Sequence, residues 1–357
     1  MHVTSRTVGQ VFLFGEVEKR VFVKMMRQWA DFSGLSVITH CLMDNHFHMM
    51  LWVPARVEID HRGILESLER VWPEEKVVAW EKYYQAQGAD TRASMDAVVV
   101  ERMADLPEFM RVLKQSFTCW YNRTHGRKGV LWDMRYRSVV VEDSPLALMS
   151  VASYIDLNPL RAGMVENPLE YAWSGYGAAM GGDKHARRGL NVLVHLARGF
   201  LPQAALRVRK RQLASNMSDW REIAQEMSAE QSQRAGPRNW KEVQAAYRIW
   251  LVNKGESKLT VVDAKEKFRQ RKGLDPVQVI AEYEKWGTVP LRERLLVRKR
   301  AYSRGVALGR SEFLEELMRE YRSCFGPKRK KAARRVKGLA GDCMCLRQVE
   351  DDEPNGH

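Results

Sequence analysis

Cysteine is scarce in this sequence, and long apolar runs are missing. The 357 residues include five cysteines, none of them in a CxxC pair. A disulfide framework and a cysteine-rich zinc site are therefore both unexpected. No uncharged apolar stretch is long enough to span a membrane, and no signal peptide is recognisable at the start. We therefore expect a cytoplasmic protein that does not bind membranes.

Positive charge, by contrast, is plentiful. Lys and Arg number 58 against 44 Asp and Glu, which gives a formal net charge of +14. A surplus of this size indicates a polyanionic partner, and nucleic acid is the commonest one. A basic protein without such a partner is the alternative. With 45% hydrophobic residues, the chain can bury at least one full core.

The first half of the chain alternates between strand and helix patterns. Strands are predicted where β-branched residues alternate, and helices where apolar residues recur at helical spacing. The predicted strands cover residues 2–14, 35–41, 46–53 and 135–141, and the predicted helices cover 16–32, 106–121 and about 144–157. The order β-α-β-β at the start is typical of a ferredoxin-like (RRM-like) α+β domain with an antiparallel sheet. We place this domain at residues 1–180.

Beyond about residue 180 the pattern changes, and we expect residues 181–357 to form a mainly helical, basic extension with a DNA-binding or accessory role. Its most basic stretch, residues 328–337, has seven Lys and Arg side chains. Such a run can be a solvated helix face, but DNA contact is the better interpretation of so many like charges. The predicted DNA-binding residues of this stretch are Lys328, Arg329, Lys330 and Lys331.

Two histidines at the start of the third predicted strand are candidate metal ligands. His46 and His48 are two residues apart, so strand alternation directs both imidazoles to one face and Phe47 to the other. Imidazole is a good ligand for manganese, zinc and nickel ions. A His-x-His pair alone is more often structural than metal-binding, so the interpretation needs a third ligand and a reacting group.

Tyr154 and Asn158 could provide these two groups. They are four residues apart at the end of a predicted helix, which places them on one face, one turn apart. An amide oxygen can bind a hard cation, and a phenol activated by a metal or a base can act as a nucleophile. Tyr154 by itself would be read as a partly buried core residue. Tyr121 and Tyr136 are the rival nucleophiles.

Several longer motifs resemble one enzyme family. Residues 44–51, DNHFHMML, resemble the Asn-His-x-His signature of the HUH single-tyrosine transposases. Residues 154–163, YIDLNPLRAG, resemble the tyrosine helix of one branch, the REP-associated tyrosine transposases. Residues 2–6, 129–136 and 171–176 also resemble that branch, so the resemblance covers about residues 1–180 in the family's order.

The resemblance implies an HUH nuclease fold and metal-dependent cleavage of single-stranded DNA through a 5′-phosphotyrosine intermediate. It implies that His46, His48 and Asn158 are metal ligands and that Tyr154 is the nucleophile. Many relatives have glutamine where this chain has the shorter Asn158. The resemblance further implies Mg²⁺ or Mn²⁺ as cofactor, a hairpin-forming palindromic single strand as substrate, a monomer or homodimer, and association with the bacterial nucleoid.

Further basic residues of the first domain are predicted to contact phosphates, with Trp120 and Trp132 as possible stacking partners for bases. The alternative is a non-catalytic single-strand binder on an RRM-like sheet, and a third possibility is a metallohydrolase that uses water instead of tyrosine. The predicted phosphate contacts are Arg6, Lys114, Arg123, Arg127, Lys128, Arg135 and Arg137.

Overall fold

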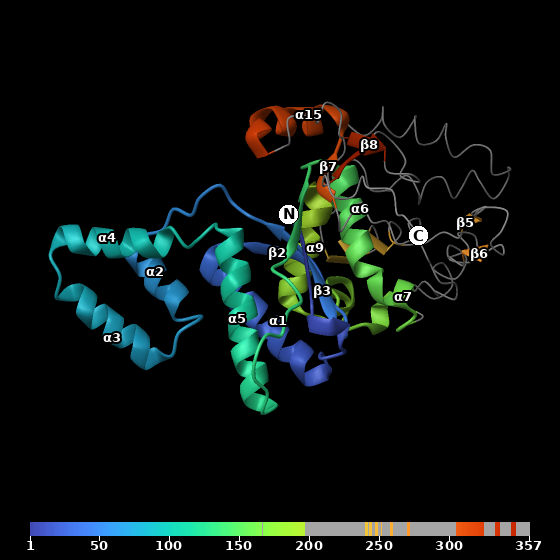
Figure 1. Ribbon diagram of the computed structural model, residues 1–357. Helices are drawn as coiled ribbons and strands as arrows, with labels where there is room; N and C mark the ends of the chain where they lie inside the picture. Colours follow the sequence, from blue (N-terminus) through green and yellow to red (C-terminus); the bar gives the residue numbers. More distant parts are fainter. Residues whose placement is uncertain are drawn as a thin grey trace. The chain divides into compact units, whose positions relative to one another are not determined.

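The computed structural model shows an α+β protein whose chain divides into two compact units (Figure 1). It describes residues 1–165, 167–196, 240–241, 243–244, 247–248, 251, 258–259, 270–271, 305–324, 333–335 and 344–347. The first unit comprises Met1, Val3–Val37 and Leu42–Tyr136, and the second comprises His2, Ile38–Cys41 and the described residues from Arg137 onward.

The strands β2, β3 and β1 follow one another in this order in the sheet; β3 and all of β1 except His2 belong to the first unit, whereas Ile38–Cys41 of β2 are counted in the second. Met43 N donates to His46 O and closes the hairpin between β2 and β3, while Leu51 N donates to Met1 O next to β1. Gly34 ends the first helix in the left-handed conformation (φ 67°), which glycine adopts without steric cost. The elements are β1 (His2–Arg6), η1 (Val8–Gln10), α1 (Glu16–Ser33), β2 (Ser36–Leu42), β3 (His46–Trp52), α2 (His61–Leu68), α3 (Glu74–Gln85), α4 (Ala89–Val100) and α5 (Leu106–Thr124).

Aromatic side chains form the core between the helices α1 and α5 and the strands. Phe22 of α1 lies 4.8 Å from Phe47 of β3 and 5.2 Å from Phe117 of α5, measured between ring centroids. Phe14 stacks on Phe117 at 5.3 Å, and the Trp132 ring lies 5.5 Å from Phe47. Aromatic rings bury much apolar area and pack in specific orientations, so this cluster fixes β3 against both helices.

The helices α2, α3 and α4 lie beside α5 in Figure 1, between β3 and α5 in the sequence. No helix was predicted from the sequence in this segment. Ile64, Leu68, Val77 and Met103 pack with Phe32 of α1 in a core of their own. The three helices therefore pack on one another and on Phe32 of α1, apart from the aromatic core.

In the second unit, strands pair across a long sequence separation. β4 pairs in parallel with β7, with Val140 opposite Ala307, and the order continues β4-β7-β9-β8. Glu142 accepts hydrogen bonds from Arg310 N and Arg310 Nε just beyond this pairing. The elements are β4 (Arg137–Val141), α6 (Pro145–Asp156), α7 (Asn158–Ala162), η2 (Pro168–Glu170), α8 (Gly175–Met180), α9 (Lys184–Leu196), β5 (Lys258–Leu259), β6 (Gln270–Arg271), β7 (Gly305–Gly309), α15 (Ser311–Glu320), η4 (Arg322–Cys324), β8 (Ala333–Arg335) and β9 (Met344–Arg347).

Three sequence predictions need correction. We expected an antiparallel sheet, but the sheet is mixed, because β4 and β7 pair in parallel. The first strand ends at Arg6, far short of residue 14, because the chain turns into η1 with Gly9 at φ 61°. The described residues after 300 include the strands β7, β8 and β9, whereas mainly helical structure was expected there. The basic residues Lys328, Arg329, Lys330 and Lys331 lie outside the described residues. Among the helices that are described, none has the length and apolar character needed to span a membrane.

Candidate functional site

His46 and His48 lie at the start of β3, and both side chains are buried, with 8% and 4% of their surface exposed. Their ring centroids are 5.2 Å apart. Phe47 belongs to the aromatic core with Phe22 and Trp132. The predicted alternation is therefore present: the core lies on one side of β3, and both imidazoles lie on the other.

Asn45 determines which nitrogen of His46 carries the proton. Asn45 Nδ2 donates to Gln10 O at 2.9 Å, and this contact fixes the orientation of the amide. Asn45 Oδ1 then lies 2.7 Å from His46 Nδ1. Because this oxygen can only accept, Nδ1 is the protonated nitrogen, and the lone pair of the neutral ring is on Nε2. The sequence predicted only a turn at Asn45, so its role as a partner of His46 was missed.

The His46–His48 pair fits two corners of a metal site. The two rings are adjacent on one rigid strand, and the amide contact to His46 is the kind of outer contact that usually orients a metal-binding imidazole. Among the described residues, no group of three or more His, Cys, Asp or Glu side chains is placed to hold a metal. A complete site here would thus need a ligand of another type, such as the predicted amide.

Tyr154 lies in α6 and is 5% exposed. The guanidinium of Arg161 lies over its ring, 4.3 Å from the centroid, and the edge of the His2 ring approaches it at 5.9 Å. A guanidinium at this distance makes a cation–π contact with the tyrosine ring. The sequence predictions included neither neighbour as a partner of Tyr154.

Asn158 is the first residue of α7, not a continuation of α6. The predicted helix was expected to end at about Leu157, and α6 does end at Asp156, with Leu157 (φ −87°, ψ 3°) as its C-cap. Tyr154 therefore lies in the last turn of α6, and Asn158 begins the short helix that follows. Asn158 Nδ2 is buried without a hydrogen-bond partner among the described residues. Nδ2 is a hydrogen-bond donor, whereas a metal would bind the amide oxygen, so this observation does not test the predicted role of Asn158 as a metal ligand.

Asp156, next to these residues on α6, is fully buried. Its Oδ1 accepts from Thr39 Oγ1 at 2.7 Å and from Tyr176 N at 3.1 Å, and its Oδ2 accepts from Tyr247 Oη at 2.6 Å. Burial raises the pKa of Asp156 to about 6, although the three hydrogen bonds act to lower it. This carboxyl group anchors the end of α6 and was not singled out in the sequence.

The rival tyrosines are less suited to nucleophilic attack. Burial, with a contribution from Glu18, raises the pKa of Tyr121, which stacks on His125 at 4.2 Å. Burial also raises the pKa of Tyr136, with Asp105 adding to the effect. A raised pKa makes the reactive phenolate harder to form, so both residues are poorer nucleophiles.

The predicted phosphate contacts occupy different environments. Lys114 Nζ donates to Met134 O at 2.8 Å and to Arg135 O, and burial lowers the pKa of Lys114 to about 8. This side chain holds the loop after α5 in place, a structural task that the sequence did not reveal. Trp132 Nε1 donates to Thr118 Oγ1, so Trp132 is a packing residue. Arg123, Lys128 and Arg135 are exposed, and Arg6, Arg127 and Arg137 are partly buried.

Each half of the predicted site is assembled within one unit. His46 and His48 belong to the first unit, together with Asn45, whereas Tyr154, Asn158 and Arg161 belong to the second. Comparisons with protein-family models, with curated proteins and with solved structures found no match.

Proposed function

We propose that this protein is a transposase-type endonuclease and strand transferase that nicks and rejoins single-stranded DNA. One observation carries the proposal: the paired imidazoles of β3 face away from the aromatic core, with the protonation of His46 fixed by Asn45. Core packing alone needs neither a second histidine on that face nor a fixed tautomer. The resemblance of residues 44–51 and 154–163 to the HUH transposases supports the same conclusion.

In the proposed reaction, Tyr154 Oη attacks the phosphorus of a phosphodiester. The bond from phosphorus to the 3′ oxygen breaks, the phenol loses its proton, and the departing 3′ oxygen gains one. The 5′ phosphate is then joined to Tyr154. In the joining step a 3′-hydroxyl attacks this phosphotyrosine, the new phosphodiester forms, and the tyrosine leaves and is reprotonated.

Residues of both units have roles in this scheme. His46 and His48, with Asn158 as the third ligand, would hold Mg²⁺ or Mn²⁺, which when bound polarises the phosphoryl oxygens. Arg161 covers one face of the Tyr154 ring and positions it. Arg123, Lys128 and Arg135 provide sequence-independent attraction for the phosphate backbone. The substrate that we propose is a single strand folded into a hairpin.

The order of the helices and strands supports a ferredoxin-like fold of the HUH type. Strands and helices succeed one another as β1-α1-β2-β3-α5-β4 once the inserted helices α2 to α4 are set aside, and β3 lies between β2 and β1. This succession is that of a ferredoxin-like domain, which the HUH nucleases share. The proposed function therefore includes an HUH-type arrangement of the sheet.

Tyr154→Phe tests the proposal directly. With a labelled single-stranded hairpin and Mn²⁺, we expect the wild-type protein to form a covalent adduct that mass spectrometry places on Tyr154. The variant should lose both adduct and nicking by at least about 1,000-fold, because phenylalanine cannot attack phosphorus. Tyr121→Phe and Tyr136→Phe are matched controls that should keep activity. Nicking that survives in Tyr154→Phe would contradict the proposal and favour water as nucleophile, and binding without any nicking would favour the non-catalytic binder.

A further inference from the structure

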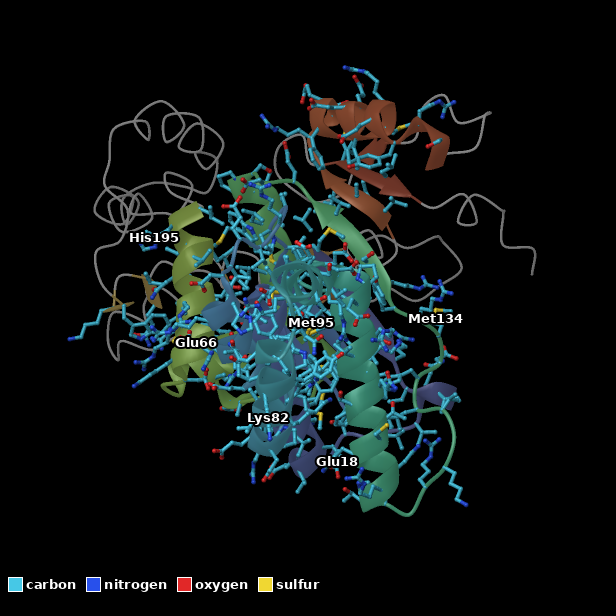
Figure 2. All side chains as sticks on the ribbon, turned by 90° about the vertical axis from the view of Figure 1, so that its left-hand side faces the viewer. Glu18, Glu66, Lys82, Met95, Met134 and His195 are labelled. Carbon is cyan, nitrogen blue, oxygen red and sulfur yellow. The ribbon has the colours of Figure 1, made fainter. Side chains whose placement is uncertain are left out.

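Two loops of the first unit lie side by side at the end of β3 that carries the histidines. One is residues 8–12, which includes η1, and the other is residues 127–131, which follow α5. Val8 N donates to Leu131 O at 2.9 Å, and Thr7 and Trp132 form an antiparallel bridge. Figure 2 shows the short blue helix η1 next to the green loop in which Met134 is labelled. We call residues 8–12 and 127–131 together the paired loops.

The paired loops expose apolar side chains that a folded protein would normally bury. Phe12 is 77% exposed, Val130 is 70% exposed, and Val11 is also exposed. A single exposed apolar residue needs no explanation, but a phenylalanine and two valines on hydrogen-bonded neighbouring loops form a patch. Their position in one small region indicates a surface that contacts a partner.

Positive charge lies on the second of the paired loops and at the end of α5 that precedes it. Lys128 and Arg123 are exposed, and Arg127 lies at the base of the second loop, where its Nη1 donates to Val130 O. Two acidic side chains nearby in the structure are engaged elsewhere: Asp44 pairs with Lys19 at 2.6 Å, and Glu18 contacts His125 Nε2 at 3.0 Å. Asp133 is the exposed acid that follows the second loop. A flat aromatic side chain bordered by cations is the surface that a single-stranded nucleic acid requires, with bases stacking and phosphates held by charge.

The paired loops are also fixed relative to the histidines. Thr7 N donates to Asn45 O at 3.0 Å, and Asn45 Nδ2 donates to Gln10 O, so Asn45 contacts both the first loop and His46. Gln10 is held at φ 56°, a conformation that costs a non-glycine residue energy and that surrounding contacts must maintain. The loop that presents Phe12 is therefore held in one conformation next to the candidate metal ligands.

From these contacts we infer that the paired loops bind the single-stranded DNA immediately next to the bond that is cleaved, with Phe12 stacking on a base and Arg127 and Lys128 contacting phosphates. This inference rests on the proposed function, because that function supplies the substrate. It assigns Phe12 and Val130 to a DNA-binding role that nothing in the sequence indicated.

The test measures binding separately from cleavage. A fluorescein-labelled single strand is titrated with protein in EDTA, in a Tyr154→Phe background, and its anisotropy is recorded. Phe12→Ala should weaken binding about 5- to 150-fold, the range found when one stacking aromatic is removed. Tyr83→Ala is the matched control, since Tyr83 is an aromatic residue of α3 with 61% exposure, and its affinity should be unchanged.

A second readout reports stacking itself. An oligonucleotide with 2-aminopurine next to the cleavage position should lose fluorescence on binding, Phe12→Trp should preserve this quenching, and Phe12→Leu should abolish it. Wild-type affinity and quenching in Phe12→Ala would overturn the inference even if the Tyr154 adduct forms. A missing adduct combined with a large effect of Phe12→Ala would instead overturn the proposed function and leave the DNA-binding surface intact.

Discussion

The histidine half and the tyrosine half of the candidate site are held in place by different means. His46 and His48 are positioned by their own strand, and the neighbouring residue Asn45 orients the first of them. Tyr154 is positioned by ring contacts with Arg161 and with His2, which lies about 150 residues earlier in the sequence. Local sequence thus determines the geometry of the histidines, whereas the surroundings of the tyrosine depend on the tertiary fold. Substitutions in each half, tested separately for nicking, metal binding and stability, show whether this difference matters for function.

After Tyr154→Phe, removal of a histidine should have the largest effect. We expect His46→Ala and His48→Ala to reduce nicking by at least about 100-fold, because metal binding and polarisation of the phosphate depend on both rings. Binding of single-stranded DNA should be largely retained, since affinity rests on phosphate contacts elsewhere. Nicking assays and anisotropy measured on the same preparations check this, with the exposed His185→Ala as control. Equal loss of binding and nicking would contradict the prediction that the histidines are needed for cleavage but not for DNA binding.

Asn45→Ala should have an intermediate effect and isolate the orientation of His46. Loss of an outer partner typically lowers metal affinity about 10- to 100-fold. Titration calorimetry with Mn²⁺, together with the Mn²⁺ dependence of nicking, measures this change. Asn45→Asp keeps an acceptor for His46 Nδ1 and should restore much of the affinity. If alanine and aspartate variants behave alike, Asn45 acts only by shaping the loop at Gln10.

The smallest effect on activity should come from Asp156, whose influence is on stability. The pKa of Asp156 is about 6 in the folded protein, whereas the ordinary value for aspartate is 3.8. As pH rises, the folded state therefore keeps this proton to a higher pH than the unfolded state does. This group therefore lowers the free energy of unfolding as pH rises from about 4 to about 6, by roughly 3 kcal/mol. Above pH 6 its contribution is constant.

Asp156→Asn removes this titration and keeps an acceptor for Thr39. We expect the variant to gain stability relative to wild type as pH rises through that window, as measured by urea unfolding at pH 4.5 and pH 7. Asp133→Asn controls for the loss of one exposed carboxylate. A stability difference that does not change between the two pH values would show that Asp156 is not neutral at low pH in the folded protein.

Sequence patterns predicted the elements whose signals are local. Helix α1, with Gly34 after its last turn, and the alternation of His46, Phe47 and His48 on β3 required only neighbouring residues. Strand β7 was missed because it is defined by its pairing with β4, which no local pattern records. The contact of Arg161 with Tyr154 was missed because one arginine seven residues away, past a helix break, has no distinctive signal. Asn45 was read as a turn residue, since its hydrogen bonds become apparent only once the first loop is placed beside it.

The pairing of β4 with β7 also has a consequence for the order in which the protein forms during synthesis. Val140 pairs with Ala307, so the ribosome must add well over a hundred residues after β4 before its partner exists. At ordinary translation rates this takes roughly 10 to 30 s. Throughout that time the edge of β4 that β7 will occupy is open, and α6, with Tyr154, follows directly after it. The nascent chain thus carries an unpaired strand edge next to α6 until β7 is made, and an early stop of translation would leave that edge without its native partner.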